Sequence, residues 1–249
     1  MIKKLNKYFQ RAFDCDYSQK LKIMKNKFSL LSSVLLMSAM IIFSSCNEDD
    51  DKSYANVMVT HASPDAPGVD LLIDNVKQNS AALTYPNNTG YLDVEEGMRN
   101  FKINVAGTPT SVINADISLT KDANYSVFAI NAVSNISAVV FTDDLSTPAS
   151  GKAHVRFLHL SPTAPAVDIA VASSGAVVFG NVSFPNGTAF TPLDAGTYNL
   201  DVRVAGTSTV ALVLPAITLE AGKIYTVFAK GFLAGAGAQA LGAEIIVNK

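Results

Sequence analysis

Two ten-residue stretches, HASPDAPGVD at residues 61–70 and HLSPTAPAVD at residues 159–168, share seven letters at the same places. The shared letters are His, Ser, Pro, Ala, Pro, Val and Asp. A histidine, a serine and an acid are the residue types of a hydrolytic site, whereas two prolines are typical of a change in chain direction. Because the whole stretch occurs twice, we interpret it as repeated framework and not as an active site.

Each stretch follows an alternating apolar strand. Val57 and Val59 precede His61 at a spacing of two, which predicts that the imidazole closes the inward face of that strand. The following Ser-Pro pair ends the strand, and the serine hydroxyl is expected to bond within its own turn. Asp70 is expected on the face opposite to the core. The repeated structural motif comprises His61, Ser63, Pro64, Pro67 and Asp70, and in the second copy His159, Ser161, Pro162, Pro165 and Asp168.

The repetition extends over two whole domains. FKINVAGT (101–108) matches LDVRVAGT (200–207), and its apolar letters alternate with polar ones, as in a strand with one face in the core and one in water. Turn residues recur at the spacing of an antiparallel sandwich. We therefore predict an all-β protein of two tandem antiparallel, immunoglobulin-like β-sandwich domains. Their predicted bounds are 55–145 and 153–249, with a linker at 146–152.

The pattern V-x-x-x-H-x-S-P-x-A-P-x-V-D, present in both copies, resembles the opening of the domain-of-unknown-function 4397 family. The resemblance covers residues 55–249. It implies exported bacterial proteins that often carry tandem copies of an immunoglobulin-like sandwich. It implies no activity, because that family has none established.

The first 45 residues are predicted to be a signal peptide. From Met24 the chain has a basic start, an apolar run at 28–43 and small residues before Cys46, which is the order of a secretory signal. Met24 is the better start site. FSSC at 43–46 resembles a bacterial lipobox, which implies cleavage between Ser45 and Cys46 and lipid attachment to Cys46. The alternative is a simple signal anchor with an incidental cysteine.

An acidic tether follows the proposed anchor. NEDDDK at 47–52 has four successive acids, so we predict a lipidated, solvated tether at 46–54. It resembles the acidic tag that sends some lipoproteins to the outer face of the bacterial outer membrane, and a plain flexible tether is the alternative. A surface-exposed outer-membrane lipoprotein is therefore expected, with the periplasmic face as the other location.

The charge of the remaining chain argues against nucleic acid as a partner. Residues 1–45 contain eight of the 19 Lys and Arg and two of the 21 Asp and Glu, which leaves 11 basic and 19 acidic residues and a net charge near −8. Nucleic-acid affinity comes largely from Lys and Arg neutralising phosphates. Cys46 is the only thiol after the proposed cleavage, so no internal disulfide is expected.

Two chemical alternatives compete with the structural interpretation of the motif. A hydrolytic triad of His61, Ser63 and Asp70 lacks a G-x-S-x-G elbow, and its serine precedes a proline. A metal site of His61, Asp65 and Asp70 lacks the clustered spacing of zinc or calcium loops. We therefore predict no catalytic residue, no cofactor and no metal ligand.

The sequence favours a non-catalytic envelope or cell-surface lipoprotein, with a structural, adhesive or spacer role. Its expected partners are the membrane, through the lipid anchor, and a protein or glycan at the cell surface. The alternative is a glycan- or ligand-binding lipoprotein for nutrient capture. Tyr85, Tyr91 and Phe232 are the candidate sugar platforms, because the chain has no Trp, and Phe232 lies in the Gly/Ala-rich loop at 230–242.

Overall fold

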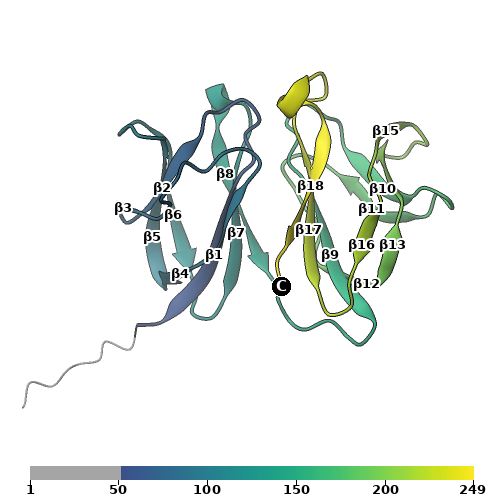
Figure 1. Ribbon diagram of the computed structural model, residues 1–249, viewed down its shortest axis with the longest axis horizontal. Coiled ribbons are helices and arrows are strands. Elements are labelled where there is room, and N and C mark those ends of the chain that lie inside the picture. Colours follow the sequence, from purple (N-terminus) through teal and green to yellow (C-terminus); the bar gives the residue numbers. More distant parts are fainter. Residues whose placement is uncertain (1–51) are drawn as a thin grey trace, which may run out of the picture. The chain divides into compact units, whose positions relative to one another are not determined.

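A computed structural model describes residues 52–249, in which the regular structure is β-strands and two short 3-10 helices (Figure 1). The predicted signal peptide and the lipid-attachment residue Cys46 lie outside the described residues, as does most of the acidic tether. No helix in the described part of the chain has the length and hydropathy needed to cross a membrane.

Two four-stranded sheets build the first sandwich. One has the order β4-β1-β7-β8 and the other the order β3-β2-β5-β6. A short 3-10 helix, η1 (Val133–Asn135), joins β7 to β8. The strands are β1 (Tyr54–His61), β2 (Val69–Ile73), β3 (Val76–Lys77), β4 (Asn88–Glu95), β5 (Gly97–Val105), β6 (Ser111–Leu119), β7 (Asn124–Ile130) and β8 (Ser137–Asp143).

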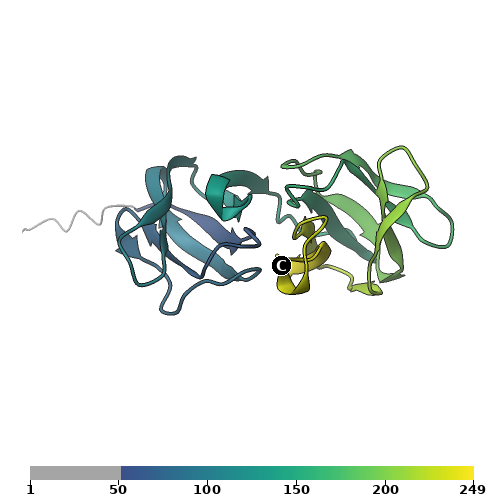
Figure 2. The ribbon, with the colours of Figure 1, turned by 90° about the horizontal axis from the view of Figure 1, so that it is seen from above.

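The second sandwich repeats this plan with sheets in the orders β12-β9-β17-β18 and β11-β10-β14-β15, and adds the pair β13-β16. The 3-10 helix η2 (Gly237–Gln239) lies between β17 and β18, shown in yellow in Figure 2. The strands are β9 (Lys152–His159), β10 (Val167–Val171), β11 (Val177–Val182), β12 (Thr191–Asp194), β13 (Gly196–Tyr198), β14 (Leu200–Val204), β15 (Val210–Val213), β16 (Ile217–Leu219), β17 (Ile224–Lys230) and β18 (Gly242–Val247).

The sheets confirm the predicted pair of sandwiches and add one feature to it. Strand pairing is antiparallel except for β1 with β7 and β9 with β17, which are parallel. A parallel pair needs a long crossover, and here most of each domain separates the two strands. The strand that is continuous as β6 in the first copy is divided into β15 and β16 in the second. Pro215 lies between these two strands, and proline cannot donate to a sheet ladder.

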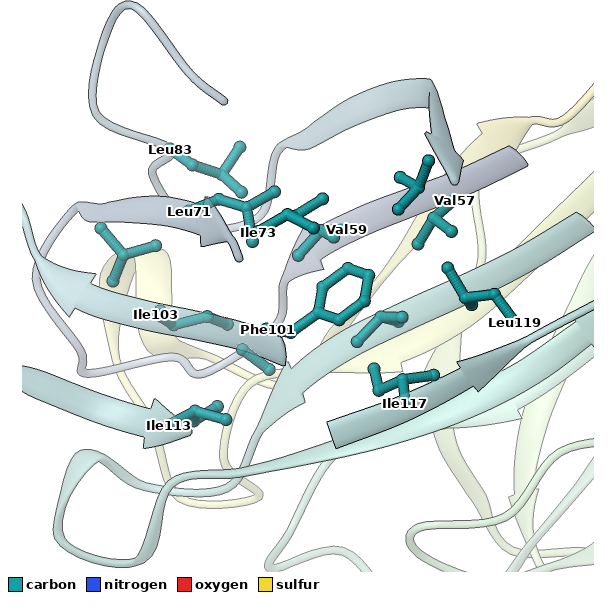
Figure 3. Close-up of a cluster of buried hydrophobic side chains, with 14 of the residues drawn as sticks. Val57, Val59, Leu71, Ile73, Leu83, Phe101, Ile103, Ile113, Ile117 and Leu119 are labelled. Carbon is teal, nitrogen blue, oxygen red and sulfur yellow. The ribbon is translucent and has the colours of Figure 1, made fainter. Parts of the chain in front are cut away.

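Each sandwich encloses its own hydrophobic core. In the first copy Val57, Val59, Leu71, Phe101 and Ile103 are buried between the two sheets (Figure 3). The equivalent core of the second copy includes Val155, Phe157, Ile169, Phe179, Val202, Tyr225 and Val227. The predicted alternation is therefore confirmed for the inward-facing residues of both copies.

A third apolar cluster joins the two sandwiches. Met58 and Phe128 come from β1 and β7, and Leu158 and Phe228 from β9 and β17, each no more than 2% exposed. These side chains alternate with the core residues of their strands, so β1 and β9 are buried on both faces. The alternation in the sequence predicted only the inward row of these two strands; their second face is covered by the other sandwich.

Candidate functional site

The histidine of each repeated stretch is buried at the end of its strand. His61 and His159 are 0% exposed. His61 Nε2 lies 3.0 Å from the carbonyl oxygen of Pro67, and His159 Nε2 lies 2.9 Å from that of Pro165. Because a carbonyl oxygen only accepts, Nε2 carries the hydrogen in both rings. Burial lowers the pKa of both imidazoles below its usual value, which favours the neutral form.

The serine of each stretch reaches a distant loop. Ser63 Oγ donates to the carbonyl of Asn131 at 2.6 Å, and Ser161 Oγ donates to the carbonyl of Gly231 at 2.6 Å. The expected bond within the serine's own turn is therefore wrong. The acceptors directly follow β7 and β17 and have φ of 73° and 79°, a left-handed conformation that Asn and Gly adopt most readily. The serine thus ties the end of one strand to the turn after its parallel neighbour.

The prolines and the variable residue between them complete this crossing. Pro64 and Pro162 follow the two serines and begin the turns, while Pro67 and Pro165 supply the carbonyls that accept from the histidines. Asp65 and Thr163 occupy the same place in the two copies. Asp65 Oδ1 accepts from the backbone N–H of Val133, and Thr163 Oγ1 accepts from that of Leu233, both at 2.8 Å. The contact is kept although the residue type differs.

The aspartate at the end of each stretch holds a hairpin turn. Asp70 Oδ2 accepts from the N–H of Gly107 at 2.9 Å, and Asp70 Oδ1 lies 2.8 Å from Lys77 Nζ. Asp168 accepts from the N–H groups of Asn181 at 2.6 Å and Gly206 at 2.8 Å. The bonds from Gly107 and Asn181 are the main reason that the pKa of each carboxyl is lowered. Each aspartate therefore joins its strand to the following VAGT turn.

Each of the three triad candidates bonds to a backbone group of a different segment. His61 bonds to Pro67, Ser63 to Asn131, and Asp70 to Gly107, so Ser63 has no bond to a base. Within residues 52–249, no group of three or more His, Cys, Asp or Glu is placed to hold a metal ion. The motif geometry supports cross-linking of strand ends.

The three aromatic candidates make contacts within the protein. The Tyr91 hydroxyl donates to Asp143 Oδ2 at 2.5 Å and accepts from Asn248 Nδ2 at 3.0 Å. The Tyr85 ring stacks edge-to-face with His61 and lies 5.4 Å from Lys230 Nζ; burial raises the pKa of Tyr85 to about 12. Phe232 is half-buried in the Gly/Ala-rich loop, and its N–H donates to Gln239.

A polar network between the sandwiches was not foreseen from the sequence. Its centre is Arg156, 2% exposed, whose Nη1 lies 2.7 Å from Asp143 Oδ1. The detectable sign was Arg156 itself, a charged residue inside the apolar strand VRFLH where the first copy has Met58. A charge on a strand that is otherwise hydrophobic indicates a buried partner.

An open hollow lies on the first sandwich where the edges of its two sheets meet. Arg99 is held there by ion pairs to Asp74 at 3.2 Å and to Glu95 at 3.1 Å, and Tyr54 is 42% exposed at the rim. The hollow is lined by Tyr54, Ile73, Asp74, Val76, Gln78, Asp93, Val94, Glu95 and Arg99.

Comparison with known proteins identifies one family. The sequence model of the family described as Domain of unknown function (DUF4397) matches residues 55–170 and 171–247, which confirms the predicted resemblance and its tandem copies. The border between the two matches lies within β10, whereas the sheets divide between β8 and β9. No curated protein matches the chain.

Among solved structures, the chain is similar to a carbohydrate-binding module of family CBM26 from Eubacterium rectale Amy13K, crystallised with maltoheptaose. The identity is 9%, the TM-score is 0.22, and the match covers 77% of this chain and 96% of the other. A TM-score this low supports no conclusion about shared fold or shared ligand.

Proposed function

This chain belongs to the DUF4397 family of unknown function, and we propose that it is a non-catalytic lipoprotein of the bacterial cell envelope. In this proposal, lipid on Cys46 anchors the protein to the outer membrane, most simply on its outer face. The two sandwiches then act as a structural, spacer or adhesive unit at the surface. A protein or glycan at the cell surface is the proposed partner of that unit.

The observation that carries the proposal is the use of the repeated motif as a cross-link. In both copies the histidine, serine and aspartate are buried and bonded to backbone groups of separate segments. A nucleophile needs a base within hydrogen-bond reach and access to substrate, and Ser63 has neither. The motif therefore stabilises each sandwich, which supports a mechanical role over a chemical one.

The joining of the sandwiches supports the spacer role. Domains in one chain move relative to each other unless their interface is large and hydrophobic. Here the rings of four phenylalanines lie at the interface together with Met58, Leu158 and Ile246; they are Phe128, Phe141, Phe184 and Phe228. Two modules joined in this way move as a single body, so the second sandwich is held at a defined distance from the anchored end of the first.

The anchor part of the proposal rests on the sequence around Cys46. Tyr54, where β1 begins, is the eighth residue after Cys46. An extended chain spans at most about 3.6 Å per residue, so the first sandwich would lie within roughly 30 Å of the lipid. Residues 47–51 contain four acids and no Lys or Arg. This composition favours solvation of the tether over burial.

Metabolic labelling with palmitate tests the anchor. We expect label in the full chain expressed in a Gram-negative host and none in the Cys46→Ala variant, which should be released from the membrane fraction. Protease treatment of intact cells then tests the exposure, and digestion without lysis is the expected result. Absence of label from the parent chain would contradict the lipoprotein proposal.

A glycan array separates the spacer role from nutrient capture. Residues 47–249 are suitable for this test, because residues 52–249 form a compact unit with its own cores. We expect no saturable binding at the Tyr85 and Tyr91 faces, since both rings contact protein groups. Binding that is lost on Tyr91→Phe would favour the glycan-binding function.

A further inference from the structure

We propose that a buried polar network fixes the pairing and the relative orientation of the two sandwiches. The inter-sandwich network consists of Tyr91, Ser126 and Asp143 on the first sandwich and Arg156, Thr226 and Asn248 on the second. It lies between the sheet β4-β1-β7-β8 and the sheet β12-β9-β17-β18. The outer face of the sheet β4-β1-β7-β8 thus fits the second sandwich as its partner, and in a single relative orientation.

The guanidinium of Arg156 is bonded along both of its edges. Nη1 lies 2.7 Å from Asp143 Oδ1, and Nη2 donates to Ser126 Oγ at 3.0 Å; both partners belong to the first sandwich. Nε donates to Thr226 Oγ1 at 2.9 Å within the second sandwich. The planar fork of arginine makes these directions mutually dependent, so a rotation between the sandwiches breaks several bonds together.

The remaining members close the network around the ion pair. Asp143 Oδ2 accepts from Ser126 Oγ and from the Tyr91 hydroxyl, both at 2.5 Å. Thr226 Oγ1 donates to Asn248 Oδ1 at 2.7 Å, and Asn248 Nδ2 donates to the Tyr91 hydroxyl at 3.0 Å. The side chains of Arg156 and Asp143 are 2% and 0% exposed. Burial of two charges is tolerated when they are paired with each other and further hydrogen bonds surround the pair.

Comparison of the two copies shows that the faces are complementary and not identical. Met58 pairs with Ser126 in the first copy, and Arg156 pairs with Thr226 in the second, so Met58 and Arg156 hold equivalent positions. Asn248 likewise follows β18 at the place that Asp143 holds in β8. Each copy therefore supplies only one member of the ion pair.

This difference makes pairing between identical faces unfavourable. Two first-sandwich faces would bury two Asp143 carboxylates without a cation, and two second-sandwich faces would bury two Arg156 guanidiniums without an anion. An unpaired buried charge is strongly destabilising, so complementary charges select one partner and reject the other. The apolar cluster supplies adhesion between the sheets, and the network supplies the choice of arrangement.

Distance measurements by pulsed electron paramagnetic resonance test the proposal. Residues 47–249 contain no cysteine, so one spin label can be attached to each sandwich at exposed Ser111 and exposed Ala211 after substitution to cysteine. The substitutions to compare are Arg156→Met and Asp143→Asn, singly and together, because each introduces the residue of the other copy. Arg99→Met is the matched control, since it breaks ion pairs away from this interface.

We expect a narrow distance distribution for the parent and for Arg99→Met. Each single interface variant should melt at a lower temperature and show a broader or displaced distribution. The double variant removes both charges, so its melting temperature should recover above that of the worse single variant while its distribution stays broad. A double variant as narrow as the parent, and centred at the same distance, would overturn the proposal even if the single variants fail to fold.

Discussion

Replacing His61 by alanine removes a fully buried ring. It also removes the Nε2 donor that lies 3.0 Å from the carbonyl oxygen of Pro67. Deleting a large buried side chain destabilises by about 2–5 kcal/mol, and a buried acceptor left unpaired adds about 1–3 kcal/mol. Pro67 itself is exposed, so water can reach its carbonyl and the second contribution falls at the lower end. We therefore expect a loss of about 3–4 kcal/mol in the free energy of unfolding.

The repeat provides an internal replicate of this experiment. His159 has the same burial and a 2.9 Å contact with Pro165, so His159→Ala should have the same effect to within about 1 kcal/mol. The two rings lie in different sandwiches and share no hydrogen-bond partner, so their effects should add in the double variant. For a unit of this size, 1 kcal/mol shifts the melting temperature by about 2–4 °C, which predicts a fall of roughly 6–16 °C for each single variant.

Urea unfolding and thermal melting of residues 47–249 measure these effects. His154→Ala is the control, because His154 is half-buried and its Nδ1 has no hydrogen-bond partner, and it should lose less than about 1 kcal/mol. Stability of His61→Ala within about 0.5 kcal/mol of the parent would refute the cross-link argument. A fall in the melting temperature of the parent protein on addition of a chelator would also refute the cross-link argument, because it would indicate a metal ion at the motif.

Three further predictions concern the titration of the motif, its serine and the packing of one glycine. Burial lowers the folded-state pKa of His61 and His159, so the free energy of unfolding should be constant above about pH 7.5 and fall below pH 6.5. The fall should reach up to about 1.4 kcal/mol per pH unit for each ring. Substitution of both histidines by Gln should remove this pH dependence. Ser63 should not react with a fluorophosphonate probe, and Ser63→Ala should destabilise by about 1–2 kcal/mol. Gly187→Ala should destabilise by about 1–3 kcal/mol, because its Cβ would lie 2.1 Å from Leu158 Cδ2.

These predictions have separate controls and separate contrary outcomes. The sign of the pH effect follows from the unfolded chain binding protons at a higher pH than the folded one, and a parent more stable at pH 5.5 than at pH 7.5 would contradict it. Covalent labelling of Ser63 would revive the hydrolase hypothesis. Gly180→Ala is the control for Gly187→Ala, since its Cβ would meet neighbours only at 3.4 Å or more. Equal stability of the two glycine variants would contradict the packing argument.

Much of the fold was predictable from the repeat. The alternation of Phe101 and Ile103 with polar residues correctly indicated an inward face, and the Ser-Pro pair correctly marked the end of β1. The histidine was correctly placed at the end of the inward row, and its burial follows. These properties depend on neighbours in the sequence, which is why a single chain was sufficient to infer them.

The partners of the motif were less predictable. Ser63 was expected to bond in its own turn and instead reaches Asn131, 68 residues away. Nothing in the local sequence distinguishes these two bonds, because both satisfy the hydroxyl. The parallel pairing of β1 with β7 brings the turn after β7 to the serine, and that pairing is a property of the complete sheet.

The repeat and the alternation were sufficient to infer two copies of one β domain, the inward rows of its central strands, and the turns between them. Burial of the second face of β1 and β9, and the contact of Arg156 with Asp143 across the two copies, became evident only from the folded chain. A period of two places a side chain on one face of a strand or the other, but it carries no information about what covers that face. Contact between two sheets depends on complementary shape and charge contributed by residues far apart along the chain.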